Sequence, residues 1–267
     1  MVKSADRVLL ILELIARRKG GLKHTEIADS LKIPQSSLSK LLATLVANEY
    51  LTFDKENKRY RLGPQILTLS TRYLSDLDVV RFAQPAIDDL AYRTGESASL
   101  AIKKGTEAMF VCKQESSQAI IPRLGIGERV PLYATAVGKV LLAYLPEEEL
   151  DRFIKSVELA PLTEFTITDP RSLLRELRLI RKRKIAYSRE EQIKGLFAMA
   201  APIFDLTNRV VAGMTVVTPK VRFNKKKDVL IRDVLAESAA TLSQSLGFNK
   251  EINAKENKKE KTIGDQH

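Results

Sequence analysis

The chain has 267 residues, of which 44% are hydrophobic, so it is long enough to form two domains that each bury a core. Lysine and arginine outnumber aspartate and glutamate by 44 to 33, which gives a formal net charge of +11 at pH 7. A basic chain favours polyanionic partners, either a nucleic acid or an anionic membrane surface. The single cysteine, Cys112, excludes an internal disulfide, and its apolar neighbours indicate a thiol buried in a strand.

The N-terminal segment lacks the features of a signal peptide or a membrane span. Its apolar stretch is interrupted by Glu13, is followed by Arg17 and Arg18, and has no cleavage site of small residues. No other segment reaches the length of a transmembrane helix. We therefore expect a soluble cytoplasmic protein without a membrane partner.

Three short helices are predicted at the start of the chain. Residues 5–18 have an apolar face at helical spacing, and the glycine pair at 20–21 ends this helix. Thr25 is placed to cap a short second helix. Pro34 fits the first turn of a third helix within residues 32–45, because a proline there lacks only an N–H that has no partner in the helix.

The predicted third helix has two faces of different character. Its apolar stripe consists of Leu38, Leu41, Leu42 and Leu45. Its opposite side consists of Ser36, Ser39, Lys40 and Ala43. Such short polar side chains allow a helix to enter a DNA major groove, which is roughly 12 Å wide. The alternative is an ordinary solvated helix face that is rich in serine.

As a recognition helix, this segment offers contacts of several kinds. A glutamine can pair with adenine, a lysine can reach guanine or phosphate, and hydroxyl groups can bond phosphates or base edges. The candidate DNA-binding residues of this helix are Gln35, Ser36, Ser37, Ser39, Lys40 and Thr44.

A basic hairpin is predicted directly after the third helix. Residues 51–53 and 59–62 alternate as strands, and residues 54–58 supply the turn. Three short helices followed by such a hairpin have the layout of a winged helix-turn-helix. The candidate DNA contacts of the wing are Lys55, Lys58, Arg59 and Arg61, mostly to phosphates. A solvated hairpin, whose charge is diluted by acidic neighbours, is the alternative.

Beyond the hairpin, the pattern indicates a linker and a second domain. Gly63–Pro64 breaks the chain, residues 66–82 have the periodicity of a helix, and Pro85 is expected to end it. From there helices and strands alternate. Helices are predicted at 86–94, 134–145, 170–182 and 228–246, and strands at 98–103, 108–113, 196–204 and 210–217. The charged tail, residues 249–267, has almost no apolar residues, and we expect it to be disordered.

A second basic cluster lies between residues 171 and 184. Its density makes a nucleic-acid site conceivable, but Leu173, Leu177 and Ile180 give the segment a buried face. We therefore favour the solvated surface of a helix in the second domain.

Taken together and in this order, the motifs resemble the isocitrate lyase regulator (IclR) family of bacterial transcription factors. In the first domain they are HTEIADSLKIP, SSLSKLLATL and KRYRLG. In the second domain they are TGESASLAI, PLYATAVGKVLLAYLP, TDPRSLLRELRLIRKRKIAYSREEQIKG and AMAAPIFDLTNRVVAG. The resemblance extends from about residue 4 to about residue 248.

The resemblance implies an α+β protein with two functional parts. These are an N-terminal winged helix-turn-helix domain over residues 1–63 and a C-terminal GAF-like α/β effector-binding domain over residues 85–248. They are joined by a linker helix, residues 64–84, that is used in dimerisation. It further implies a homodimer or a dimer of dimers that binds a palindromic operator in double-stranded DNA, and represses or activates genes of small-acid catabolism.

The resemblance also places an effector site in the second domain. The matching positions are Ala136, Val137, Ser188, Ala198, Thr215 and Val217. The family holds a carboxylate with backbone N–H groups near the TAVG turn and with small polar side chains. Because Ala198 and Val217 stand where polar residues can occur, we expect a less polar or larger ligand, held mainly by backbone donors. The alternative is that all of these residues are simply core, above all Ala198 and Val217.

Three basic residues depart from the family pattern. Lys40 stands where arginine is common, which weakens the expectation of a bidentate contact to guanine. Lys32 and Lys184 stand where glycine is common, so a side chain occupies one tight turn and one helix terminus of this chain.

The sequence lacks the residues of a catalytic centre. Gly138–Lys139 has neither the upstream glycine nor the following hydroxyl residue of a phosphate-binding loop. The only histidines are His24 and His267, so a histidine triad is excluded and neither a metal site nor a cofactor is predicted. Two rival classes stay open, namely an enzyme with a DNA-binding appendage and a non-specific architectural DNA binder.

Overall fold

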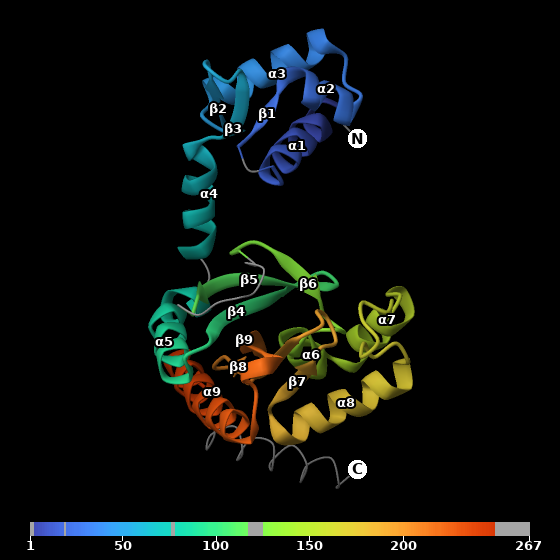
Figure 1. Ribbon diagram of the computed structural model, residues 1–267, viewed down its shortest axis with the longest axis vertical. Helices are drawn as coiled ribbons and strands as arrows, with labels where there is room; N and C mark the ends of the chain where they lie inside the picture. Colours follow the sequence, from blue (N-terminus) through green and yellow to red (C-terminus); the bar gives the residue numbers. More distant parts are fainter. Residues whose placement is uncertain (1–2, 19, 76–77, 117–124, 249–267) are drawn as a thin grey trace, which may run out of the picture. The chain divides into compact units, whose positions relative to one another are not determined.

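The computed structural model describes residues 3–18, 20–75, 78–116 and 125–248 (Figure 1). The chain divides into two compact units, residues 1–76 and residues 77–267. The predicted disordered tail lies outside the described residues.

The first unit combines helices with a small antiparallel sheet. Its helices are α1 (Lys3–Ala16), α2 (His24–Leu31), α3 (Gln35–Ala47) and α4 (Pro64–Ser75). Its strands are β1 (Leu22–Lys23), β2 (Leu51–Asp54) and β3 (Arg59–Leu62), in the order β1-β3-β2. Apolar stripes of α1, α2 and α3 meet in one core, in which Ile11, Ile27 and Leu42 are fully buried. The predicted helix-turn-helix with a hairpin wing is confirmed.

One predicted cap in this unit is wrong. Thr25 lies inside α2, and Lys23 is the residue that precedes the helix. The backbone N–H of Lys23 donates to the Glu26 carboxylate at 2.6 Å. The Glu26 carboxylate in the first turn thus takes the place of a hydroxyl cap. Its negative charge is also favourable at the positive end of the helix dipole.

The predicted single helix over residues 66–82 is also wrong. The structure has α4 up to Ser75 and a separate helix α5 (Asp78–Thr94), with Pro85 inside it. Proline removes one helical hydrogen bond, yet the buried stripe of α5 continues on both sides of it, with Ala83 and Ile87 fully buried. Packing of this stripe therefore outweighs the local preference of Pro85 to end a helix.

The second unit is an α/β domain built on one antiparallel sheet. Its strands are β4 (Ser97–Lys104), β5 (Glu107–Gln114), β6 (Arg129–Pro131), β7 (Ala186–Arg189), β8 (Leu196–Phe204) and β9 (Val210–Pro219). Its further helices are α6 (Ala136–Ala143), α7 (Glu147–Ser156), α8 (Pro170–Arg183), the 3-10 helix η1 (Lys220–Arg222) and α9 (Lys225–Ser245). The predicted strand pairs β4–β5 and β8–β9 are confirmed, and β4 and β9 join them at the centre of the order β6-β5-β4-β9-β8-β7.

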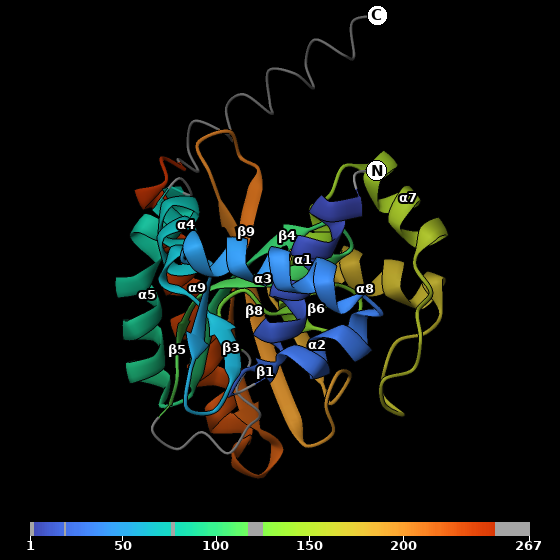
Figure 2. The ribbon, with the colours of Figure 1, turned by 90° about the horizontal axis from the view of Figure 1, so that it is seen from above.

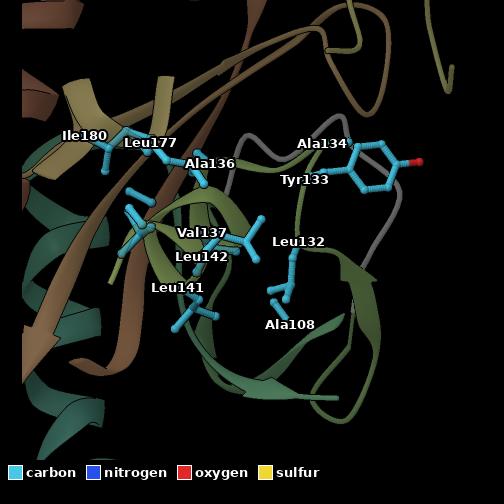
Figure 3. Close-up of a cluster of buried hydrophobic side chains, with 14 of the residues drawn as sticks. Ala108, Leu132, Tyr133, Ala134, Ala136, Val137, Leu141, Leu142, Leu177 and Ile180 are labelled. Atoms are coloured by element: carbon cyan, nitrogen blue, oxygen red, sulfur yellow. The ribbon is translucent and has the colours of Figure 1, made fainter. Parts of the chain in front are cut away.

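Helices cover both faces of this sheet. α5 and α9 lie side by side against one face (Figure 1, Figure 2). α6 lies against the other face, and α8 packs on α6. Figure 3 shows Leu177 and Ile180 of α8 directed toward α6, whereas the ring of Tyr133 points away from the cluster. The Tyr133 hydroxyl donates to the carbonyl of Ala160 at 2.9 Å.

The predicted one-sided burial of the basic helix is confirmed. Leu173, Leu177 and Ile180 of α8 are buried, and the cationic side chains lie on the exposed side. Some of these cations have structural partners. Arg181 donates to the carbonyl of Ala143, for example.

Cys112 is buried, as predicted, and its thiol donates to the side-chain oxygen of Gln84 at 3.0 Å. Burial raises the pKa of this thiol to about 11. A group that stays a neutral thiol at physiological pH is a weak nucleophile, so Cys112 has the chemistry of a small core residue.

Candidate DNA interface and effector site

The third helix presents the two faces that the sequence predicts. Leu38, Leu42 and Leu45 are buried against the rest of the first unit. Ser36, Ser39 and Lys40 are exposed on the opposite side, together with Gln35 and Thr44, whereas Ser37 is half-buried. Helix α3 therefore offers a continuous surface of short polar side chains with one cation.

Two of these hydroxyls are already engaged within the helix. The Ser39 hydroxyl donates to the carbonyl of Gln35 at 2.9 Å, and the Thr44 hydroxyl donates to the carbonyl of Lys40 at 3.0 Å. A hydroxyl that donates to its own helix can still accept a bond from a base amino group, although the Ser39 oxygen already lies 3.0 Å from Nε2 of His24. Lys40 has no ion pair within the described residues, so its ammonium group is available to an anion.

The hairpin between β2 and β3 is organised by Asp54. Its carboxylate accepts the backbone N–H groups of Glu56 and Asn57, each at 3.1 Å, and the side-chain amide of Asn57 at 2.9 Å. These bonds hold the pKa of Asp54 below its ordinary value, and the bond from the Asn57 side chain has the largest effect. The turn that they fix leaves Lys55 and Lys58 exposed at its tip.

The two arginines of the hairpin are placed differently from these lysines. Arg59 donates to the carbonyl of Gly21 at 2.8 Å and contacts the Glu26 carboxylate at 3.3 Å. Arg61 is half-exposed and lies 3.4 Å from the Asp54 carboxylate. Arg59 thus ties the hairpin to the start of α2, and within the described residues Lys55 and Lys58 are the cations of the hairpin tip without an ion pair.

In the second unit, the register brings four of the six expected effector residues onto one sheet face. Ser188 pairs with Ala198, and Ala198 pairs with Val217, so these three form one row across β7, β8 and β9. Thr215 lies two residues from Val217 and shares its face. This is the face that α6 covers, because the Ser188 hydroxyl donates to the carbonyl of Ala134, just before that helix, at 3.2 Å.

The other two expected residues begin α6. Thr135 caps the helix, and its side chain accepts the backbone N–H of Gly138 at 3.0 Å. The N–H groups of Ala136 and Val137, in the first turn, have no partner within the helix. A Cβ on Gly213 of β9 would lie 2.6 Å from a methyl group of Val137, so this first turn sits directly on the sheet.

These donors make the first turn of α6 suitable for an anion. Free backbone N–H groups and the helix dipole both favour negative charge at this position. The sheet residues that face this turn offer few further polar groups. Ala198 is part of the apolar packing around α6, and the Thr215 hydroxyl donates to the carbonyl of Met199 at 2.8 Å.

A buried ion pair links α6 to the loop after β7. It was not predicted from the sequence. The Lys139 ammonium lies 2.6 and 2.8 Å from the two carboxylate oxygens of Glu191, and only 1% of the lysine is exposed. Burial lowers the pKa of Lys139 and raises that of Glu191, while their contact opposes both shifts. The pair holds the loop after β7 against α6.

The neighbouring Glu190 points to different partners. Its carboxylate accepts the backbone N–H of Gly195 at 2.9 Å and contacts the Lys220 ammonium at 2.6 Å. The two adjacent glutamates therefore have separate partners. Within the described part of the chain, no group of three or more His, Cys, Asp or Glu side chains could hold a metal ion. In the same residues, no helix is long and apolar enough to span a membrane.

Comparisons with known proteins match both units. The family profile described as the bacterial transcriptional regulator IclR C-terminal domain matches residues 71–244, and that of the IclR helix-turn-helix domain matches residues 4–55. The chain therefore belongs to the IclR family of bacterial transcriptional regulators.

Particular relatives agree with this assignment over nearly the whole chain. The HTH-type transcriptional regulator BhcR of Paracoccus denitrificans is 32% identical over 250 residues, which cover 94% of this chain and 89% of the relative. The crystal structure of the Thermotoga maritima IclR is similar with a TM-score of 0.81 and 34% identity, covering 93% of this chain and all of that one. A double mutant of the inducer-binding domain of Acinetobacter PobR, in complex with 3-hydroxybenzoic acid, has a TM-score of 0.57 at 26% identity, covering 61% of this chain and 96% of that one.

Proposed function

We propose that this protein is a ligand-responsive transcriptional regulator of a catabolic operon. It reads a palindromic operator with α3 and senses a small organic acid in its second unit. The observation that carries the DNA part is the polar face of α3, on which Lys40 stands without an ion pair beside exposed short side chains. Such a regulator acts in the cytoplasm, where bacterial DNA lies.

In this proposal α3 lies in the major groove and the hairpin contacts the backbone. Gln35 and Lys40 read base edges, and Ser36 bonds a phosphate or a base edge. Lys55 and Lys58 neutralise phosphates, which supplies affinity that is independent of sequence. Arg59 contributes by holding the hairpin in position, because its guanidinium already has two partners in the protein.

The apolar side chains that the first unit leaves exposed support a homodimer. Leu9 is 60% and Leu67 is 70% exposed, on α1 and α4 respectively. Covering such side chains with a second copy removes them from water and supplies two α3 helices for two half-sites. Pairing of two such dimers would give a tetramer.

The effector site is proposed at the first turn of α6. A carboxylate fits the N–H groups of Ala136 and Val137, while Ser188, Ala198, Thr215 and Val217 form the floor. The complex of the PobR domain with 3-hydroxybenzoic acid supports an organic acid as the ligand class. Binding changes the relative placement of the two α3 helices in the dimer, and operator affinity depends on that placement.

The test is a measurement of affinity for DNA from the region upstream of the gene and for a scrambled duplex, over a series of salt concentrations. Lys40→Ala should weaken upstream binding unevenly across sequence variants and reduce the preference over scrambled DNA. The matched control is Lys182→Ala, because Lys182 is an exposed lysine of α8 without an ion pair among the described residues. Equal binding of the wild-type protein to both duplexes at every salt concentration would contradict the proposal and favour an architectural binder.

A second assay separates the regulator from an enzyme. BhcR is named a transcriptional regulator, and no group of three or more His, Cys, Asp or Glu side chains among the described residues could hold a catalytic metal ion. Incubation with candidate organic acids should therefore show saturable binding without any product. Turnover of a bound acid would favour the enzyme.

A further inference from the structure

One mostly buried hydroxyl beside the proposed effector site makes no hydrogen bond within the described part of the fold. Ser99 of β4 is only 6% exposed. Its side chain has no hydrogen-bond partner among the residues that the structure describes. The Ser99 oxygen is not one of the fully enclosed side-chain oxygens without a partner among the described residues, which belong to Tyr144, Thr218 and Ser238, so it keeps a small accessible surface.

The sheet register places Ser99 on the face that α6 covers. Ser99 lies directly opposite Thr215, and Ala101 lies opposite Gly213. Gly213 is the residue on which Val137 of α6 sits. Ser99 is therefore one pleat, roughly 7 Å, along the sheet from the first turn of α6.

Ser99 differs from the other hydroxyls of this face in what it can offer. The Ser188 and Thr215 hydroxyls donate their protons to backbone carbonyls, and the Ser97 hydroxyl accepts the backbone N–H of Ser116 at 3.1 Å. Ser188 and Thr215 can therefore only accept further bonds. The proton of Ser99 is uncommitted. Lys113, opposite Ser99 on β5, has its ammonium group 3.1 Å from the Glu115 carboxylate.

We infer that Ser99 is a specificity-determining contact of the effector site, donating a hydrogen bond to an oxygen of the bound acid. This rests on the proposed function and narrows its ligand class. A carboxylate at the first turn of α6 and a donor one pleat away select an acid with a second oxygen-bearing group remote from the carboxylate. A hydroxyl on that group would also find acceptors in Ser188 and Thr215.

The test introduces a thiol at this position and needs no knowledge of the natural ligand. The full-length Ser99→Cys variant is treated at pH 8 with iodoacetate, which carries a carboxylate, and separately with iodoacetamide, which is neutral. In both reactions the thiolate attacks the methylene carbon, iodide leaves, and the thiol proton passes to the buffer. Cys112 is an internal control, because burial raises its pKa to about 11.

The matched control is Ala98→Cys, since Ala98 is fully buried on the opposite face of the same strand. We expect the thiol of Ser99→Cys to react at least tenfold faster than that of Ala98→Cys. For Ser99→Cys, the ratio of the iodoacetate rate to the iodoacetamide rate should be higher in the folded protein than in denaturant. An equally slow reaction of both variants, or an unchanged ratio, would overturn the inference.

A second measurement needs only side-chain truncations. Because the Ser99 hydroxyl has no partner, Ser99→Ala should leave the melting temperature unchanged or raise it. Thr215→Val should lower it, because the bond to the carbonyl of Met199 is lost. Equal losses in the two variants would show that Ser99 has a structural role and would contradict the inference.

The same samples separate this inference from the proposed function. DNA affinity is measured for the Ser99→Cys protein before and after carboxymethylation. Selective labelling that leaves DNA affinity unchanged would support the site but contradict its coupling to DNA. Specific DNA binding by a protein whose introduced thiol does not react would overturn the site and leave the DNA-reading function intact.

Discussion

At the scale of single residues, the contacts of greatest consequence are buried and long-range. Lys139 and Glu191 are 52 positions apart in sequence, yet they form a buried ion pair. Ser99 and Thr215 meet only through the pairing of β4 with β9. Local patterns carry no information on such pairs, so the sequence predicted the hydroxyl of Thr215 but neither the ion pair nor Ser99.

The ion pair predicts an asymmetric response to mutation. Lys139→Met or Glu191→Gln should each lower the free energy of unfolding by about 3–5 kcal/mol, because each leaves a buried group without its partner. The double variant Lys139→Met/Glu191→Leu should lie closer to the wild type, since no buried charge remains. Urea denaturation measures all three. A stability of the single variants equal to that of the wild type would contradict a buried, coupled pair.

Backbone geometry predicts a stabilising change at Lys32. This residue ends α2 with a φ of 50°, in the left-handed region that favours glycine. Lys32→Gly should raise the stability of the first unit by up to about 1 kcal/mol, because relief of the left-handed strain exceeds the added chain entropy. Asp29→Gly, inside the same helix, is the control and should be destabilising. A loss of stability in Lys32→Gly, seen by thermal denaturation, would refute the assignment of strain.

At the scale of elements, apolar periodicity predicted most of the architecture. The helices α1 to α3, the hairpin of the first unit, the pairs β4–β5 and β8–β9, and α6, α8 and α9 were all expected from the sequence. It did not predict β6, α7 or β7. β6 and β7 are short edge strands of three and four residues, and α7 has only Leu150 and Phe153 buried. Such elements depend on tertiary packing, as does the continuation of α5 through Pro85.

The hairpin predicts different effects for two adjacent basic residues. Lys58→Ala should weaken binding to all DNA sequences similarly and reduce the slope of log affinity against log salt by about 1. Arg59→Ala should instead lower the stability of the first unit by about 1 kcal/mol, because its bonds to Gly21 and Glu26 are lost. Affinity titrations and melting curves of both variants check this division. Stability losses of equal size would show that Lys58 also holds the hairpin.

At the scale of the whole molecule, the two structural units match the two domain profiles of one regulator family. The first unit has the polar helix face and the basic hairpin, and the second has the proposed effector site at the first turn of α6. We propose that effector binding in the second unit changes operator affinity through the arrangement of two copies of the chain on DNA. Neither the sequence pattern nor the fold of one chain specifies the operator or the effector, since both are selected by a few side chains at the surface of each site.

The most direct test of the central claim is the dependence of DNA affinity on the spacing of the two operator half-sites. Once nuclease footprinting has located the site, five or ten base pairs are inserted between its halves, and affinity is measured by fluorescence anisotropy. Two α3 helices in a dimer predict a loss of about tenfold or more with five base pairs, which is half a helical turn, and substantial recovery with ten. Affinity that is indifferent to both insertions would contradict a dimeric reader of paired half-sites.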